Sequence, residues 1–282
     1  MIIWNKGKFY ISNLLSKNLN NYIDGVLNKN TSAVFIFDGR SGLGKTTISC
    51  QVGCYITLKV AKLLDREPAF NLDNLAFTPE QFIDKLQAAK KGDVIIFDEA
   101  MIISNRSAMS EVNRMVIIMM SMIRSKQIFV IFNINSIFDM DKNLPLHRAD
   151  MLVHLYAEND KFGARGRYMV VPSAKGKLKR LYIQGKKYYD YSKSRPAFVD
   201  HFSGWFPLDN KEYENKKQDS IENYFGSQKT SISNAMEQRN RLIEYLRGEG
   251  KSTETIANLS GLSLRSVQRV LKSDLDIKYK QQ

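Results

Sequence analysis

Residues 33–46 read AVFIFDGRSGLGKT, and this segment is the most informative about the fold class. Its first five residues are apolar without interruption, which is typical of a strand buried on both faces of a parallel sheet. Glycines follow at positions 39, 42 and 44, so the chain has the freedom to turn tightly after the strand. We expect a helix from residue 46 to about residue 64, which gives the order strand, glycine loop, helix.

The glycine loop matches the pattern G-x-x-x-x-G-K-[ST] in full. Glycines let such a loop wrap around phosphates and aim backbone N–H groups at them, and the following helix N-terminus adds partial positive charge. In this motif Lys45 reaches the β- and γ-phosphates, and the hydroxyl of Thr46 ligates Mg²⁺. We therefore predict that the chain binds ATP and Mg²⁺. The predicted loop consists of Gly39, Arg40, Ser41, Gly42, Leu43, Gly44, Lys45, Thr46 and Thr47.

A second buried strand is expected at residues 93–97, and it leads directly into Asp98 and Glu99. In a doubly wound sheet the carboxyl end of this strand lies beside the phosphate loop. We expect Asp98 to hold Mg²⁺ through water, and Glu99 to orient and deprotonate the attacking water. Two adjacent acids favour hydrolysis of ATP over transfer of its phosphate to a small acceptor, so the pattern predicts an ATPase.

Three more strands are expected near residues 75–77, 128–132 and 151–156, and a methionine-rich helix at 113–125. Strands that alternate with helices indicate a mostly parallel sheet. The sequence therefore predicts an α/β fold, that of a P-loop NTPase of the RecA/ASCE-like kind.

Two asparagines follow the strand expected at 128–132. Asn133 or Asn135 would lie next to the γ-phosphate and sense it, although an ordinary turn at a strand end explains them equally well. Four arginines are candidates for a finger that reaches the γ-phosphate of a neighbouring subunit. The sequence does not choose among its candidates, which are Arg106, Arg114, Arg124 and Arg148.

Over residues 33–157 the order of these parts resembles the HerA/FtsK group of P-loop motors. The zonula-occludens-toxin-like and viral DNA-packaging ATPases are similar to that group. The resemblance implies a motor that pumps DNA through a ring, usually a hexamer, and it implies that Asn133 or Asn135 takes the place of the group's polar sensor. The toxin-like phage proteins also carry a membrane helix, and no such segment is evident in this sequence.

Residues 161–195 hold eleven lysines and arginines against one acid, Asp190. Glycines and alternating polar and apolar residues predict one or two β-hairpins here. Cations neutralise phosphates and aromatic rings stack on unpaired bases, so we predict contact with nucleic acid. The alternative is a solvated sheet face whose aromatic side chains lie in the core. The predicted contact residues are Arg165, Arg167, Lys175, Lys177, Lys179 and Arg180.

The C-terminal residues have the pattern of a helix-turn-helix. Ala257, Gly261 and Val267 fall where this motif needs a small packing residue, a left-handed turn residue and a buried branched residue. The last helix would then show Arg265, Ser266, Gln268 and Arg269 to the major groove of DNA. The alternative is a small helical bundle that docks on another protein. We expect three parts, namely an ATPase domain at 1–207, a linker at 208–234 and the helix-turn-helix at 235–282.

Net charge and composition indicate which partners and which cellular compartment to expect. The net charge is +13 and the pI is near 9.5, which is typical of a protein that meets a polyanion or an acidic membrane surface. Cys50 and Cys54 are expected to be buried core residues in a reducing cytoplasm. The longest nearly apolar run, 115–123, is shorter than the ~20 residues that span a bilayer. We therefore expect a cytoplasmic protein.

The patterns together favour an ATP-hydrolysing motor that translocates or packages double-stranded DNA and forms a homo-oligomer. An alternative is a regulatory or helper ATPase, in which ATP switches assembly on DNA and is not a fuel. A third interpretation, a nucleotide or nucleoside kinase, leaves the C-terminal motif unexplained.

Overall fold

The computed structural model describes residues 2–4, 7–98, 123, 125–157 and 166–278. The chain divides into two compact units, Met1–Ile221 and Glu222–Gln282. We call them the sheet unit and the C-terminal unit and describe each by itself. The helix expected at 113–125 falls almost entirely outside the described residues.

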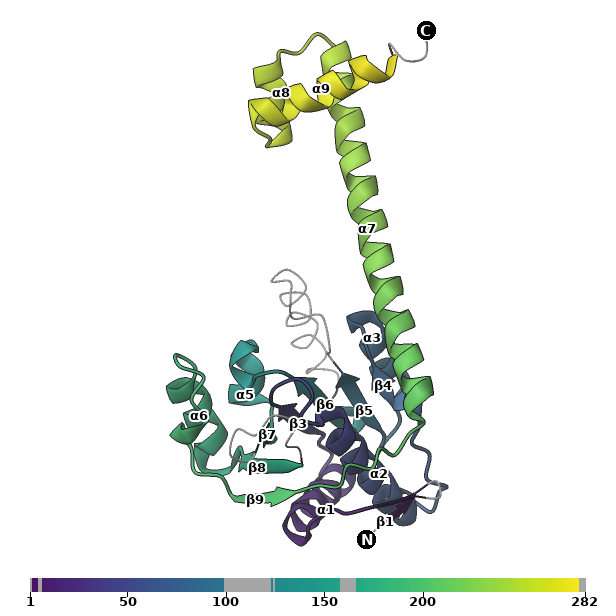
Figure 1. Ribbon diagram of the computed structural model, residues 1–282, viewed down its shortest axis with the longest axis vertical. Helices are drawn as coiled ribbons and strands as arrows, with labels where there is room; N and C mark the ends of the chain where they lie inside the picture. The colour runs from purple at the N-terminus through teal and green to yellow at the C-terminus, as the bar shows by residue number, and fades with distance from the viewer. Residues whose placement is uncertain (1, 5–6, 99–122, 124, 158–165, 279–282) are drawn as a thin grey trace. The chain divides into compact units, whose positions relative to one another are not determined.

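The sheet unit is built on a seven-stranded sheet with the order β4-β5-β6-β3-β7-β8-β9 (Figure 1). The first five strands in this order are parallel, and β8 and β9 extend the sheet in the antiparallel sense. This confirms the prediction of an α/β fold with a mostly parallel sheet. The strands are β3 (Ala33–Asp38), β4 (Leu75–Ala76), β5 (Val94–Asp98), β6 (Phe129–Ile134), β7 (Met151–Tyr156), β8 (Arg167–Pro172) and β9 (Phe198–His201).

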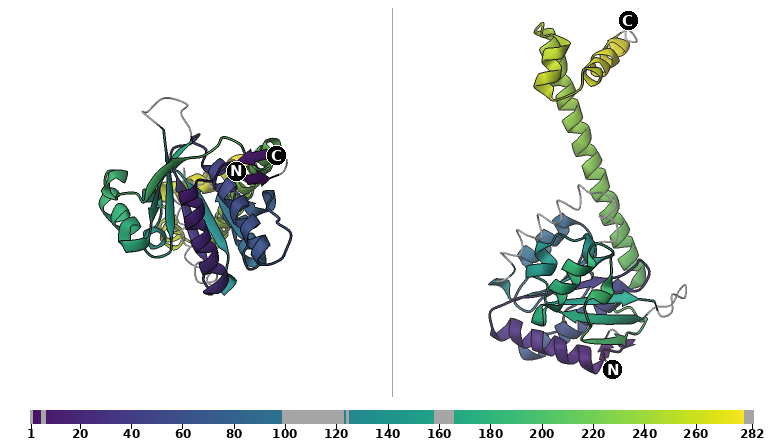
Figure 2. Two further views of the ribbon diagram at one scale, coloured as in Figure 1. Left: turned by 90° about the horizontal axis from the view of Figure 1, so that it is seen from below. Right: turned by 90° about the vertical axis from the view of Figure 1, so that its left-hand side faces the viewer.

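Helices cover both faces of the sheet (Figure 2). Strand β3 lies in the middle of it, and every residue of β3 is buried. Phe35 and Phe37 pack in the core under α1 (Asn13–Asn28) and α2 (Lys45–Leu63). Val34 and Ile36 pack in the opposite core, together with residues of the helices on that face. Those helices are α3 (Pro79–Ala88), α5 (Asn143–His147) and α6 (Lys177–Gly185). Burial on both faces explains why the strand sequence is a continuous apolar run.

Both cysteines lie in the core, as predicted. Cys50 and Cys54 are on α2 and have no exposed surface. Burial raises the pKa of both thiols, so neither is a reactive thiolate at neutral pH.

A two-stranded antiparallel sheet of β1 (Ile2–Trp4) and β2 (Gly7–Phe9) precedes α1. Phe9, at the end of β2, is buried and stacks on Trp205 with ring centroids 5.7 Å apart. This contact ties the start of the chain to the segment that follows β9.

The basic segment 161–195 does not form the predicted β-hairpins. It contains β8, a short 3-10 turn at Ala174–Gly176, helix α6 and another 3-10 turn at Tyr191–Lys193. Leu178, Leu181 and Tyr182 recur at helical spacing and are buried in the core on the α3 side of the sheet. The pattern over residues 177–185 is therefore helical, and the prediction of hairpins was wrong.

The segment 208–234, which the sequence predicts to be a linker, is helical from residue 210. It belongs to α7 (Asn210–Gly248), a helix of 39 residues that begins in the sheet unit and supplies the first helix of the C-terminal unit. Asp209 caps its start by accepting a hydrogen bond from the backbone N–H of Glu212 at 2.8 Å. The segment is polar, but it contains no proline and Gly226 is the one glycine before the helix end, so nothing in it breaks a helix.

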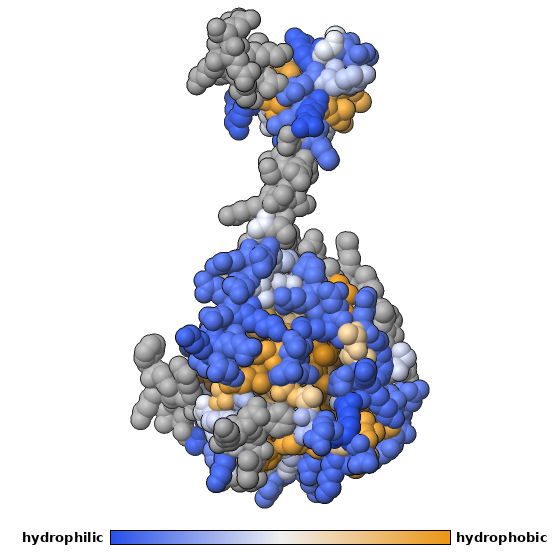
Figure 3. All heavy atoms as spheres, turned by 90° about the vertical axis from the view of Figure 1, so that its right-hand side faces the viewer, coloured by the Kyte–Doolittle hydropathy of each residue, from blue (hydrophilic) through white to orange (hydrophobic). Residues whose placement is uncertain are grey.

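The C-terminal unit packs the end of α7 with α8 (Thr253–Ser260) and α9 (Leu264–Lys278). Its small core contains Ile243 of α7, Ile256 and Ala257 of α8, and Val267 of α9. Gly261 ends α8 with a φ of 67°, the left-handed conformation that its place in the pattern predicts. On the face shown in Figure 3, hydrophilic side chains of this unit surround a few hydrophobic ones.

No helix within the described residues has the length and apolar character needed to cross a membrane.

The turn that leads into β7 carries a carboxyl group with a displaced pKa. The backbone N–H of Val34 donates to Oδ2 of Asp150 at 2.8 Å, and this bond joins the turn to β3. Burial raises the pKa of Asp150 from 3.8 to about 6. A raised pKa in an acid means that folding disfavours its charged form, so the protein loses stability as the pH rises from about 4 to above 6.

We predict that Asp150→Asn becomes more stable relative to the wild type as the pH rises through this range. An asparagine keeps the acceptor for Val34 and carries no charge, so the gain approaches about 3 kcal/mol above pH 7 and vanishes near pH 4. Urea unfolding at pH 4, 6 and 8 measures the difference. Asp65→Asn, at an exposed position, controls for the change in net charge. A difference that is independent of pH contradicts the prediction.

Candidate nucleotide and metal site

The candidate site lies where β3, β5 and β6 end. These three strands are neighbours and parallel, so their carboxyl ends meet at one edge of the sheet. The glycine loop, residues 39–44, leaves β3 at this edge and leads into α2. Asp98 pairs with Asn133 across β5 and β6, which brings the predicted acid and one predicted sensor side by side.

Two glycines give the loop a path that other residues cannot follow. Gly39 has a φ of 139°, and a Cβ there would lie 2.5 Å from the carbonyl oxygen of Leu155 in β7. Gly44 has a φ of 94°, and a Cβ there would lie 2.9 Å from the ring of Phe202. Both positions combine a left-handed backbone with a close neighbour, so the loop requires glycine at each.

Lys45 folds back over the loop. Its Nζ donates hydrogen bonds to the carbonyl oxygens of Gly39 and Arg40 at 2.6 and 3.2 Å, and to Oδ1 of Asn135 at 3.2 Å. Burial lowers the pKa of Lys45, while the charges of Asp98 and Asp38 act in the opposite direction. The ammonium group is held inside the curve of the loop and is bound to groups that an anionic ligand can replace.

Asp98 collects donors from several elements. The hydroxyl of Thr46 donates to its two carboxylate oxygens at 3.3 and 3.2 Å, and Nδ2 of Asn133 donates to Oδ1 at 3.3 Å. Asn133 also donates to the hydroxyl of Ser49 at 2.9 Å. Asp98 and Asn133 are 4% and 1% exposed, so the donors offset the cost of a buried carboxylate.

Tyr213 and Lys217 of α7 also belong to this cluster, although no motif in the sequence marks them. The hydroxyl of Tyr213 donates to Oδ2 of Asp98 at 2.5 Å. Lys217 donates to the same hydroxyl at 2.9 Å, and its Nζ lies 4.0 Å from Oδ2 of Asp98. Burial raises the pKa of Tyr213, and the charge of Asp98 adds to the effect, so the phenol stays a donor. Both residues lie in the segment that had been predicted to be a linker.

The residues at this edge fit a magnesium ion. Mg²⁺ prefers oxygen ligands, and the hydroxyl of Thr46 and the carboxylate of Asp98 supply them side by side. Oδ1 of Asn133 is buried and has no hydrogen-bond partner among the described residues, which leaves one more oxygen in the same cluster. Such an orphaned acceptor suits a water molecule of the kind that Mg²⁺ retains.

A second buried carboxylate anchors the start of the loop from the other side. Asp38 is the last residue of β3 and has no exposed surface. It accepts hydrogen bonds from the backbone N–H of Ile137 at 2.8 Å, from Nδ1 of His154 at 2.7 Å and from the hydroxyl of Tyr191. The rings of His154 and Tyr191 stack with centroids 3.6 Å apart. These contacts fix the point at which the chain leaves the sheet.

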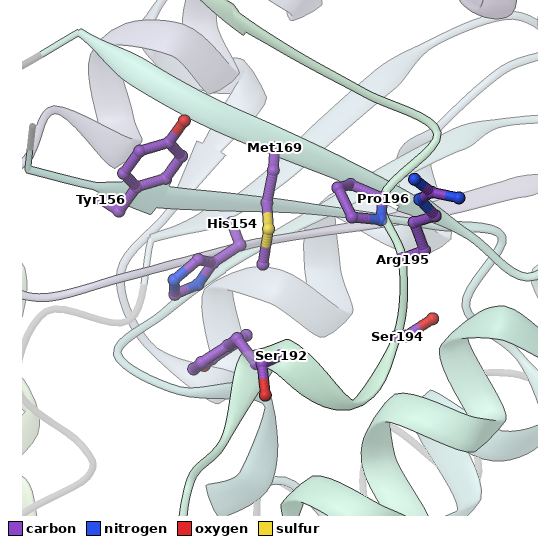
Figure 4. A pocket seen from close by; sticks show the side chains of 8 residues that line it. His154, Tyr156, Met169, Ser192, Ser194, Arg195 and Pro196 are labelled. Atoms are coloured by element: carbon purple, nitrogen blue, oxygen red, sulfur yellow. The ribbon is translucent and has the colours of Figure 1, made fainter.

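Both stacked residues line an open pocket of about 470 Å³, which Figure 4 shows from close by. One wall consists of His154, Tyr156 and Met169 from β7 and β8, and the other wall comes from the segment that leads into β9. That segment contributes Tyr191, Ser192, Ser194, Arg195 and Pro196. Aromatic faces beside an arginine suit a flat ring, and the hydrogen bonds to Asp38 connect this pocket with the glycine loop.

The structure brings together the predicted nucleotide residues that it describes. Lys45, Thr46 and Asp98 converge at this edge. The two asparagines differ in their contacts, because Asn133 donates to Asp98 whereas Asn135 accepts from Lys45. Five of the predicted residues lie outside the described part of the chain, namely Glu99, Arg165 and the candidate finger residues Arg106, Arg114 and Arg124. Arg148, the remaining candidate for an arginine finger, is exposed.

Most of the residues predicted to contact nucleic acid are accessible. Lys175, Lys179 and Arg180 are exposed on α6 or beside it, whereas Lys177 and Arg167 are half-buried. Of the aromatic residues in this segment, Tyr168 and Tyr182 lie in the core. The alternative interpretation therefore holds for these two rings. Tyr188 and Tyr189 are exposed.

On α9, Arg265, Gln268 and Arg269 are exposed. Ser266 is half-buried and shares a hydrogen bond of 2.9 Å with the hydroxyl of Ser263. Ser263 also accepts from the backbone N–H of Ser266, so the two serines cap the helix.

The chain matches no model of a known protein family and no curated protein sequence.

We predict that Asp98→Asn lowers the free energy of unfolding by about 1–3 kcal/mol in the absence of nucleotide. The amide puts a donor where Asn133 and Tyr213 already donate, so at least one buried donor loses its acceptor. Urea denaturation of the purified protein measures the effect. Asp73→Asn is the matched control, since Asp73 is an exposed acid whose partner is Lys216 on the same helix α7. Equal stability of Asp98→Asn and the wild type contradicts the prediction.

Proposed function

We propose that the chain is a Mg²⁺-dependent P-loop ATPase that acts on DNA. The observation that carries the proposal is the convergence of Lys45, Thr46 and Asp98 at one edge of a parallel sheet. Lys45 and Thr46 begin α2, directly after the glycine loop that follows β3. Asp98 ends β5 in the same sheet. Each residue type is the one that binding of a nucleotide phosphate and its metal requires.

The strand order supports the RecA/ASCE-like kind of P-loop fold. One strand, β6, lies between the loop strand β3 and the Asp98 strand β5. This extra strand brings Asn133 and Asn135 to the same edge of the sheet as the loop. In the resemblance to the HerA/FtsK group, a polar residue at the end of such a strand senses the γ-phosphate.

The residues have distinct roles in the proposed reaction. Lys45 exchanges its bonds to loop carbonyl oxygens for bonds to the β- and γ-phosphates, and the loop N–H groups hold the same phosphates. Thr46 and Asp98 would hold Mg²⁺, and the bound ion would neutralise charge that develops on the phosphate oxygens. Glu99, the next residue along the chain, accepts a proton from the attacking water. Asn135 contacts Lys45, so it is placed to respond to the γ-phosphate.

DNA is the proposed partner because two separate surfaces suit a polyanion. The exposed lysines and arginines of α6 form one, and the exposed side chains of α9 form the other. We propose that α8 and α9 form a helix-turn-helix and that the ATPase is an oligomeric motor of viral or plasmid type. The ring and the translocation of DNA rest on the resemblance to the HerA/FtsK group.

One observation favours the alternative of an ATP-switched regulatory ATPase. The helix that starts the C-terminal unit also donates hydrogen bonds to the proposed metal ligand, through Tyr213. A nucleotide that changes this contact would change the C-terminal unit without a need for rapid turnover.

Steady-state ATP hydrolysis with and without double-stranded DNA tests the proposal. We predict that DNA raises the rate several-fold and that Glu99→Gln lowers the rate by at least about a hundredfold while ATP still binds. Lys45→Ala is the control that loses binding. DNA binding is measured in parallel for a variant with Arg265, Gln268 and Arg269 replaced by alanine, which is expected to bind more weakly.

Slow hydrolysis that ignores DNA, together with a change of oligomeric state on ATP addition, contradicts the motor and supports the switch. The absence of both hydrolysis and ATP binding contradicts the proposal as a whole.

A further inference from the structure

The first turns of α7 contact the candidate metal ligand directly. Tyr213 and Lys217 are four residues apart and so lie on one face of the helix. The Tyr213 hydroxyl is 2.5 Å from Oδ2 of Asp98, and the ammonium of Lys217 is 4.0 Å from the same oxygen. A strong donor and a cation therefore lie together against one oxygen of the carboxylate that we propose as a metal ligand.

The carboxylate of Asp98 is already well supplied with donors. Within the described residues Thr46, Asn133 and Tyr213 all donate to it. Because Thr46 contacts both oxygens, four hydrogen bonds already occupy the roughly four lone-pair directions of the carboxylate, and a metal-bound water needs one of them. Thr46 and Asn133 are part of the sheet edge and the loop helix, whereas Tyr213 and Lys217 come from a helix outside the sheet. The contacts from α7 are therefore the ones that an arriving metal can replace with the least change to the sheet.

A small number of further contacts hold the start of α7 in place. The ring of Tyr213 packs against Phe77 and Phe206, with centroids 5.7 and 5.3 Å away. Lys216 pairs with Asp73 at 2.8 Å near the surface, and the hydroxyl of Ser220 accepts a bond of 2.9 Å from Gln81 of α3. Figure 1 shows these turns beside α3 and β4. An exposed ion pair contributes at most about 1 kcal/mol, so the main attachments are the bond from Tyr213 to Asp98 and the packing of the Tyr213 ring.

We propose that Tyr213 and Lys217 take the place of the metal in the nucleotide-free protein, and that Mg²⁺-nucleotide displaces them from Asp98. The displacement releases the first turns of α7 from the sheet unit. This inference rests on the proposed function, because it takes Thr46 and Asp98 as the metal site. Tyr213 and Lys217 are positioning residues that hold Asp98 and compete with the metal.

The release would matter beyond the site because α7 is one continuous helix from Asn210 to Gly248. Its residue Ile243 belongs to the core of the C-terminal unit. Helix α7 thus contacts Asp98 at its start and contributes to the core of the proposed DNA-binding unit near its end. Nucleotide binding and DNA binding are then linked, and each changes the affinity for the other by the same factor.

The test measures the Mg²⁺ concentration at which a slowly hydrolysed ATP analogue, ATPγS, half-saturates the full-length protein. Tyr213→Phe removes the hydroxyl and keeps the ring in its packing, and Lys217→Met removes the charge and keeps the length. Both variants are expected to need about tenfold less Mg²⁺, from the lower end of what a hydrogen bond to a charged group contributes. Lys216→Met, the neighbouring lysine that pairs with Asp73, is the matched control and is expected to change by less than about twofold.

Hydrogen exchange provides a readout that does not depend on affinity or turnover. In the wild type, amides of residues 210–221 are expected to exchange faster with Mg²⁺-ATPγS than with Mg²⁺ alone or with ATPγS and a chelator. In Tyr213→Phe they are expected to exchange faster even without nucleotide.

Two results would overturn the inference while leaving the proposed function intact. The first is wild-type binding that depends on Mg²⁺ and is unchanged or weaker in both variants. The second is a loss in Lys217→Met that is larger for ATPγS than for ADP, which would make Lys217 a ligand of the γ-phosphate. If the wild type shows no Mg²⁺-dependent nucleotide binding, the proposed function fails and this inference fails with it.

Discussion

A buried carboxylate at the end of β5 organises this edge of the molecule. An unpaired charge in a protein interior is costly, so Asp98 needs donors wherever the chain can bring them. Thr46 comes from the loop helix, Asn133 from the neighbouring strand and Tyr213 from α7. One side chain thus holds together the sheet, the helix that follows the glycine loop and the helix that leads into the C-terminal unit. The same carboxylate oxygens suit a metal ion, so the hydrogen bonds that stabilise the fold and a bound metal would compete for them.

Asp38 plays the corresponding part on the opposite side of the loop. Its buried carboxylate binds the backbone after β6, His154 of β7 and Tyr191 before β9. The glycine loop therefore starts from a rigid base, as a site that must hold phosphates in fixed positions requires. The aromatic pocket lies beside this base. Two residues that line it, His154 and Tyr191, bind Asp38 at the start of the glycine loop, so Asp38 connects the pocket with the loop.

Short-range patterns were enough to predict the central strands and the convergence of Lys45, Thr46 and Asp98. A buried parallel strand and a loop motif are encoded in consecutive residues, and the sheet rule then sets where their ends meet. The contact of Tyr213 with Asp98 joins residues 115 apart, and no periodic signal marks it. The segment 208–234 has a polar composition typical of a linker, but it is helical from residue 210. Capping and packing stabilise this helix, and composition alone does not reveal them. In the basic segment, the helical spacing of the buried leucines outweighed the alternation that had suggested hairpins.

We propose that this edge of the sheet holds a nucleotide phosphate together with Mg²⁺. The decisive experiment is calorimetric titration of ATPγS into the full-length wild type and Thr46→Val, with Mg²⁺ and with a chelator. Valine keeps the shape of threonine and removes the hydroxyl that lies 3.2 Å from Asp98. We expect that Mg²⁺ strengthens binding to the wild type and has little effect on the variant. Equal strengthening in both proteins, or no binding to either, would contradict it.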